Sequence, residues 1–149
     1  MKASAHMPAG GDLDLVALME HLVPEDQQAA WLIRHCISWS ATYDHVLDGD
    51  PWEPDDVHQM VRHLLWDLPN NPFYVKHFRV LSTVLLNGID AWKFANDCQE
   101  YRVKVADGLA ELGCAIFVCV GGVDRLLQCG HLWRESVLKL LKQSDNRKN

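Results

Sequence analysis

Three carboxylates, Asp44, Asp48 and Asp50, form the densest acidic group that the sequence offers for chemistry. At about 100° per residue in a helix, Asp44 falls on the same arc as the apolar residues Ile33 and Ile37. A carboxylate on an apolar stripe is costly unless it is paired, hydrogen-bonded or bound to a cation. Carboxylate oxygens are the ligands that Mg²⁺ and Ca²⁺ prefer, so these three residues are candidate ligands of a divalent cation.

This acidic group has two interpretations. A bound cation would position a phosphate or activate a water, which predicts a small metal-dependent hydrolase or a nucleotide- or metabolite-binding protein. The spacing does not match an EF-hand loop. In the structural interpretation, which we favour, Asp44 caps a neighbouring helix or pairs with a core-facing arginine, and the acidic residues up to Asp56 favour the positive end of the next helix. The available arginines are Arg34, Arg62, Arg79 and Arg102.

Other reactive residues form no recognisable catalytic or cofactor-binding motif, so the catalytic residues are unknown. The sequence has no HExxH, GxSxG, GxGxxG or GxxxxGK[ST] pattern. His58 and His63 are five residues apart, which separates them by about 140° around a helix. His35 and His45 point away from the apolar stripe and are expected at the surface. The five cysteines include no CxxC pair and predict buried, reduced thiols.

Hydrophobic periodicity and cap residues divide the chain into helices. Asp12 caps the first, Pro24 opens the second and Gly49 ends it. Helix-like spacing continues without any two-residue alternation typical of strands, and Gly121 and Gly122 are expected to interrupt the last part of the chain. The predicted helices span about 12–22, 24–48, 54–68, 72–97, 99–120 and 123–142.

These elements predict an all-α fold, a compact single-domain bundle of five to six helices. Residues 1–11 read as a flexible arm, 12–142 as the domain and 143–149 as a polar tail. The helix at about 72–97 is apolar on nearly all sides, so it is either central in the bundle or half-buried in an oligomer interface. The helix at 54–68 should bury one face.

Composition and charge exclude several partners. The net charge of −6 disfavours binding to nucleic acids and to anionic membranes. The longest apolar run, 114–120, is far below the roughly 20 residues that span a bilayer. Residues 1–11 do not resemble a secretory signal, which agrees with a cytoplasmic location. We therefore expect neither a nucleic-acid partner nor a membrane partner.

Six tryptophans point to contact with another protein. Trp31, Trp39 and Trp66 lie off the core stripes of their predicted helices, and Trp52 lies on the proline-rich connector at 50–54. Exposed tryptophans bury a large area at low entropic cost when a partner binds. Alternatively, a further helix of the same chain covers them.

Five short segments resemble small uncharacterised proteins of tailed bacteriophages and prophages, over about residues 30–125. The segments are 43–51 (YDHVLDGDP), 68–73 (LPNNPF), 91–92 (AW), 95–97 (AND) and 121–122 (GG). The resemblance implies a helical fold and a place in the bacterial host cell or the virion, and it implies no activity or catalytic residues.

The leading functional hypothesis is a non-catalytic protein that self-assembles or binds a protein partner. It rests on the two-sided apolar helix at 72–97, the off-stripe tryptophans and the lack of a catalytic motif in the sequence. The alternative is the metal-dependent hydrolase or ligand-binding protein centred on Asp44, Asp48 and Asp50. A helical pocket for a small metabolite is a third possibility.

Overall fold

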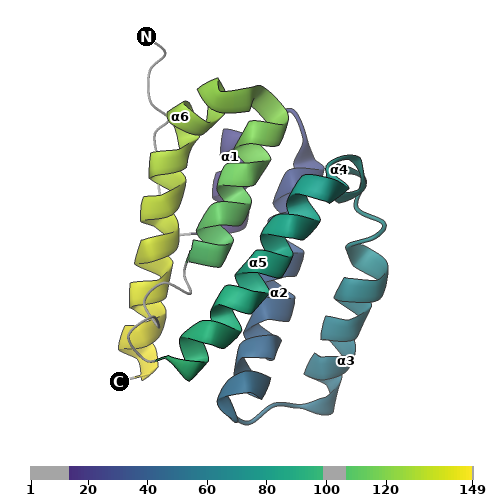
Figure 1. The fold of residues 1–149 in the computed structure, drawn as a ribbon, viewed down its shortest axis with the longest axis vertical. Coiled ribbons are helices and arrows are strands. Elements are labelled where there is room, and N and C mark those ends of the chain that lie inside the picture. The colour runs from purple at the N-terminus through teal and green to yellow at the C-terminus, as the bar shows by residue number, and fades with distance from the viewer. Residues whose placement is uncertain (1–13, 99–106, 149) are drawn as a thin grey trace.

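The computed structural model describes residues 14–98 and 107–148, and all regular elements in those ranges are helical. Figure 1 shows the helices packed side by side in an elongated bundle, with the last helix folded back along itself. The predicted all-α class is therefore confirmed. In chain order the elements are α1 (Leu15–Leu22), α2 (Gln27–Asp48), α3 (Pro54–Arg62), the π-helical turn η1 (His63–Asp67), α4 (Pro72–Lys76), α5 (Phe78–Asp97) and α6 (Asp107–Lys148).

The first two helices begin at aspartate caps. The carboxylates of Asp14 and Asp26 accept backbone hydrogen bonds, both at 2.9 Å, from the first turns of α1 and α2. The predicted second start is therefore wrong, because Pro24 lies in a turn before α2. The predicted cap at Asp12 lies outside the described residues. Gly49 ends α2 in the left-handed conformation, at φ 72°, as predicted.

The α3–η1 segment, residues 54–67, packs mainly against α2 and is much less buried than the sequence predicts. Within this described segment no side chain counts as buried, and Val61 and Leu65 are 41% and 73% exposed. The prediction that this helix buries a full apolar face is therefore wrong. The helix contacts the bundle along one side, and its last turn widens into η1, which rotates the later residues away from an α-helical stripe.

The predicted helix at 72–97 is two helices that meet at His77, whose backbone has φ −111° and ψ 26°. Its predicted cap is confirmed, because the Asn71 side chain accepts a hydrogen bond from the Tyr74 N–H at 2.9 Å. The same side chain donates to the Gln28 carbonyl at 3.0 Å, which ties α4 to α2. The break lets α4 lie on α2 while α5 runs along α6.

Only one side of α5 is covered. Leu81 is fully buried, whereas Leu86 and Phe94 are 66% and 58% exposed. Burial of α5 on both sides, the first of the two predicted interpretations, is therefore wrong for the chain by itself. The more central position belongs to α2, which contacts α1, α3, α4 and α6.

Gly121 and Gly122 interrupt α6, as predicted, and the two halves that they separate run antiparallel. Gly121 has φ −138° and ψ 15°, and Gly122 has φ 66° and ψ −158°, so neither is helical. Figure 1 shows the second half running back beside the first. The second half continues to Lys148, beyond the predicted end at 142. The predicted start of the preceding helix at 99 lies outside the described residues.

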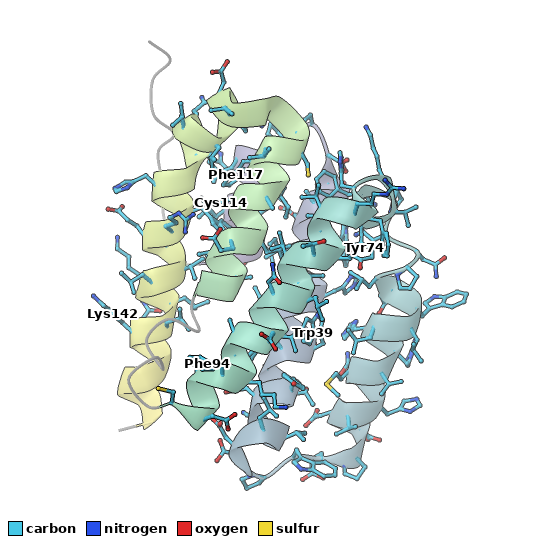
Figure 2. All side chains as sticks on the ribbon, viewed as in Figure 1. Trp39, Tyr74, Phe94, Cys114, Phe117 and Lys142 are labelled. Carbon is cyan, nitrogen blue, oxygen red and sulfur yellow. The ribbon has the colours of Figure 1, made fainter. Side chains whose placement is uncertain are left out.

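The core lies between α1, α2 and the two halves of α6. Trp133 is fully buried, and its indole N–H donates to the Leu109 carbonyl at 3.2 Å. Phe117 meets Trp133 edge to face, with ring centroids 6.2 Å apart. Figure 2 shows Phe117 and Cys114 inside the bundle and Lys142 projecting from its outer edge. The halves of α6 are thus joined by a large aromatic contact.

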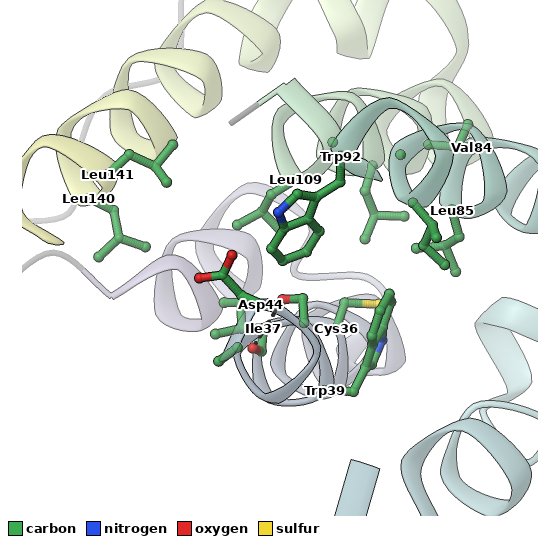
Figure 3. Close-up of a pocket in the computed structure, with 16 residues that line it drawn as sticks. Cys36, Ile37, Trp39, Asp44, Val84, Leu85, Trp92, Leu109, Leu140 and Leu141 are labelled. Carbon is green, nitrogen blue, oxygen red and sulfur yellow. Dashed lines mark hydrogen bonds between the residues drawn. The ribbon is translucent and has the colours of Figure 1, made fainter. Parts of the chain in front are cut away.

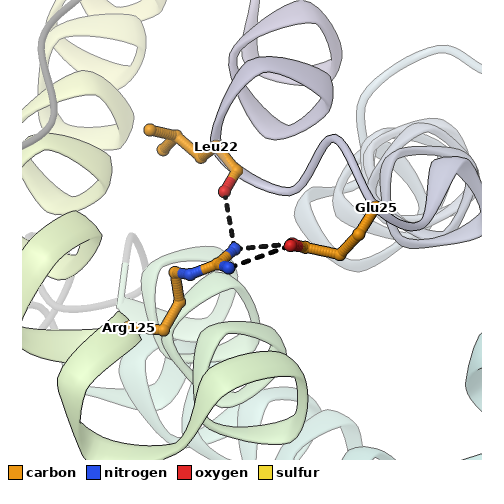
Figure 4. Close-up of polar contacts among 3 residues, drawn as sticks. All are labelled: Leu22, Glu25 and Arg125. Carbon is orange, nitrogen blue, oxygen red and sulfur yellow. Dashed lines mark hydrogen bonds and ion pairs between the residues drawn. The ribbon is translucent and has the colours of Figure 1, made fainter.

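A polar contact fixes the second half of α6 to the turn between α1 and α2 (Figure 4). The Arg125 guanidinium donates to both carboxylate oxygens of Glu25, at 2.6 and 2.9 Å, and to the Leu22 carbonyl at 3.0 Å. The fork geometry makes this a bidentate pair. It satisfies a carbonyl at the end of α1 that helical hydrogen bonds leave open.

One segment of the described chain, 108–143 within α6, is long and apolar enough to cross a membrane by length and composition, since an 18-residue stretch of it has a mean hydropathy of 1.5. The glycine break folds this segment into two antiparallel halves. Both halves contribute buried residues to the core, and helices of a buried core meet the same criterion.

Candidate functional site

An apolar pocket of about 320 Å³ lies between α2, α5 and α6 (Figure 3). Its size is at the lower end of the range for small-molecule sites, and positions between bundle helices are common for such sites. Residues from both ends of α6 reach it, so segments distant in sequence build one wall. Its lining is Cys36, Ile37, Trp39, Ser40, Ala41, Asp44, Val84, Leu85, Gly88, Ile89, Trp92, Gly108, Leu109, Leu112, Leu140 and Leu141.

Two tryptophans supply the aromatic part of the pocket. Trp39 is only 6% exposed and belongs to the core, so the prediction that it lies off the core stripe is wrong. Tyr43 packs edge-on between them, with its centroid 6.3 Å from that of Trp39 and 5.7 Å from that of Trp92. This row of rings joins α2 to α5. The other tryptophans expected at the surface, Trp31, Trp52 and Trp66, are 44%, 48% and 67% exposed, as predicted.

Asp44 is half-buried and is the single acidic side chain among the described residues that line the pocket. Figure 3 shows its carboxylate directed toward the space between Trp92 and Leu140. Asp48 lies one turn later at the end of α2, and Asp50 follows that helix; both are exposed. The sequence therefore placed Asp44 correctly on the inner side of α2. Divalent-cation binding by the three aspartates remains a prediction.

The polar residues beside Asp44 are not activated as nucleophiles. Burial raises the pKa of the Cys36 thiol to about 12. The Ser40 hydroxyl donates to the Ile37 carbonyl of its own helix at 3.1 Å. No histidine is among the described residues that line the pocket. The arrangement is suited to binding an apolar group rather than to attacking one.

The prediction of buried, reduced cysteines is confirmed in part, because Cys98 and Cys119 are only half-buried. All five are free, and Cys36, Cys114 and Cys129 are buried. Desolvation also raises the pKa of Cys114, Cys119 and Cys129. These thiols are therefore weak nucleophiles at neutral pH.

Two glycines allow α5 and α6 to approach closely at the pocket. A Cβ placed on Gly88 would lie 3.6 Å from the Cα of Gly108, which is ordinary contact. Side chains larger than a methyl group at either position would separate the helices or enter the pocket. Sequence reasoning missed this contact because neither glycine stands in a turn motif.

The histidine expectations are partly wrong. His45 is exposed as predicted, but His35 is half-buried beneath the α3–η1 segment, with its ring centroid 5.0 Å from that of His63. Sequence reasoning missed this pair because its members are on different helices.

Comparisons with known proteins add no relative. The chain matches no family model, no curated protein and no solved structure. The geometry of the molecule is therefore the ground for a functional proposal.

Proposed function

We propose that the protein binds a small, mostly apolar molecule in the pocket between α2, α5 and α6, with a polar group of that molecule placed near Asp44. The observation that carries this proposal is the roughly 320 Å³ space with apolar and aromatic walls inside a bundle whose other helices interdigitate. Small-molecule sites are typically clefts with mostly apolar and aromatic walls and a few polar groups that fix the orientation of the ligand.

The apolar lining sets the affinity to be expected. Burial of about 300 Å² of apolar ligand surface contributes about 7 kcal/mol before the cost of association. The shape of the ligand would have to fit the rings of Trp39 and Trp92, which are already held in place by Tyr43.

A neutral fluorescent probe, N-phenyl-1-naphthylamine, tests this proposal. We expect saturable binding to the full chain with one site per molecule. Ser40→Leu should fill the pocket and weaken binding at least 10-fold, because Ser40 lines the pocket and bonds only to its own helix. Ser38→Leu is the matched control, since Ser38 is a half-buried residue of the same helix that does not belong to the lining.

The two variants separate pocket binding from adsorption to exposed apolar surface. Equal affinities in Ser40→Leu and the wild type, or no saturable binding to the wild type, would contradict the proposal. Near-ultraviolet circular dichroism of both variants checks that the tryptophans remain packed.

A second candidate function is self-association, which the exposed apolar side chains of the α3–η1 segment support. Val61, Leu65 and Trp66 are 41%, 73% and 67% exposed and lie within one short stretch. A second copy of the chain would cover two such faces at once through a two-fold axis. Light scattering at high micromolar concentration tests this candidate. A monomeric mass would contradict it, and a dimer lost in Leu65→Ser with Trp66→Ser would support it.

A further inference from the structure

A group of two histidines and an aspartate lies where α2 meets the α3–η1 segment, away from the apolar pocket. His35 comes from α2, and His63 and Asp67 are the first and last residues of η1. One side-chain nitrogen or oxygen from each residue lies within 4.8 Å of those of the other two. These are the side chains most often found as ligands of zinc and related ions.

The hydrogen bonds of His63 and Asp67 determine which imidazole atom remains for a ligand. His63 Nδ1 lies 2.7 Å from Asp67 Oδ2, so the neutral imidazole donates its proton to the carboxylate. The lone pair is then on Nε2. The His63 side chain is only 11% exposed, and within the described chain its Nε2 has no hydrogen-bond partner.

His35 presents a second nitrogen of the same kind. Its Nδ1 is buried and also lacks a hydrogen-bond partner among the described residues. A buried polar atom without a partner costs about 1–3 kcal/mol, so two such atoms in adjacent rings are unusual.

The backbone at this point supports the grouping. η1 is a π-helical turn, in which the Leu68 N–H bonds to the His63 carbonyl at 2.9 Å. Hydrogen bonds that span five residues place side chains four apart nearly in line, which brings Asp67 directly to His63. Single π turns occur mostly as local insertions in α-helices and are frequent at functional sites.

We propose that His35 and His63 bind a divalent transition-metal ion of the zinc class, with Asp67 orienting His63 through its Nδ1. Imidazole ligands suit zinc, cobalt, nickel and copper, whereas magnesium and calcium prefer oxygen ligands. A carboxylate that holds the second nitrogen of a ligating histidine is the usual support of such sites. Two protein ligands leave coordination positions for water or for a small anionic ligand.

The ion would have a structural consequence. The described residues of α3 and η1 include no buried hydrophobic side chain, so the segment has little apolar core of its own. A metal bound by His35 and His63 would crosslink the segment to α2 and would stabilise it by the binding free energy. The site thus joins the least buried segment to the most central helix.

Titration of the untagged, chelator-treated full chain with Co²⁺ tests the proposal by visible absorption. We expect one saturable site with nitrogen and oxygen coordination, and competition by Zn²⁺. His35→Gln and His63→Gln should each weaken binding at least 100-fold. Asp67→Asn should weaken it about 10- to 100-fold, the usual effect of removing a supporting carboxylate.

His131→Gln is the matched control. His131 also pairs with a carboxylate four residues later, Glu135, at 3.1 Å, but its side chain is 87% exposed. This variant should bind Co²⁺ like the wild type. Saturable binding that survives His63→Gln, or an unchanged affinity in Asp67→Asn, would overturn the assignment.

The absorption spectrum of the Co²⁺-loaded wild type tests the histidine ligands by itself, even where a variant fails to fold. Strong near-ultraviolet bands of thiolate–cobalt charge transfer would show that cysteines hold the ion and would overturn the proposal. The lack of any saturable site in the wild type would do the same.

Discussion

The two halves of α6 and the α3–η1 segment show two ways in which one chain holds its helices. In the α6 region Trp133, Phe117 and Ile116 are fully buried and interlock across the glycine break. In the described α3–η1 segment no side chain is buried, and Leu65 is 73% exposed. Both segments are amphipathic helices in sequence. They differ in how many other helices pack against them.

This contrast separates stability from function. The α6 region has close packing that tolerates little change, which is typical of a structural core. The α3–η1 segment makes one-sided contacts and contributes His63 and Asp67 to the group that they form with His35 of α2, so polar interactions contribute more to its position. Segments with few buried contacts open locally at lower free energy than the core. Three predictions test this contrast, beginning with the largest expected effect.

Gly113→Ala should strongly destabilise the core. A Cβ at this position would lie 2.0 Å from Trp133 Nε1, so the indole would have to move and its bond to Leu109 would be lost. We expect a loss of about 3 kcal/mol, measured by urea unfolding. Gly88→Ala is the control, because its Cβ would meet Gly108 at 3.6 Å and the helix should gain up to about 1 kcal/mol. Equal stability of Gly113→Ala and the wild type would contradict the packing described.

The same truncation should have different costs in the two regions. Leu112→Ala removes a side chain that is 1% exposed and should cost about 2–5 kcal/mol. Leu65→Ala removes a side chain that is 73% exposed and should change the free energy of unfolding by less than about 0.5 kcal/mol. Urea denaturation followed by far-ultraviolet circular dichroism measures both. Similar losses would show that the segment is covered in solution, as self-association requires.

The smallest effect concerns the pair of Glu25 and Arg125. The hydrogen bond and charge of Arg125 hold the pKa of Glu25 below its usual 4.5, against a smaller effect of desolvation. The stabilising contribution is therefore fully present above pH 4.5 and is lost as the pH falls through the lowered value. Glu25→Gln should lower the melting temperature slightly at pH 7, and the difference should shrink as the pH falls below 4.5.

Glu20→Gln, at an exposed position of α1, is the control for this measurement. A difference that does not shrink would mean that packing of Glu25, and not its charge, is responsible. Glu25 and Glu20 belong neither to the pocket lining nor to the histidine group, so these two measurements are independent of both proposals.

The sequence predicted the fold where local signals determine it. The cap at Asn71, the left-handed Gly49 and the interruption at Gly121 and Gly122 follow from the conformations that these residues prefer. The same reasoning failed at His77, where no proline or glycine marks the break between α4 and α5. That break depends on which neighbours each helix meets.

The candidate sites were less predictable, because they are formed by residues on different helices. Asp44 could be identified since a carboxylate on an apolar stripe is unusual in one helix alone. Trp39 was misplaced because it lies at the edge of the α2 stripe, where α5 and α3 decide its burial. His35 and His63 meet only because α3 folds back on α2 and ends in a π-helical turn. Periodicity in a single helix contains no information on that pairing.

The position of Leu140 and Leu141 in the pocket wall has a consequence for synthesis of the chain. The opposite wall begins at Cys36, so about a hundred residues are translated between the first and the last parts of the pocket. A ribosome-bound chain that has already formed α1 to α5 still lacks this wall. Ligand binding would therefore report that the second half of α6 has docked. A molecule that occupies the pocket would favour the completed protein over its nascent forms.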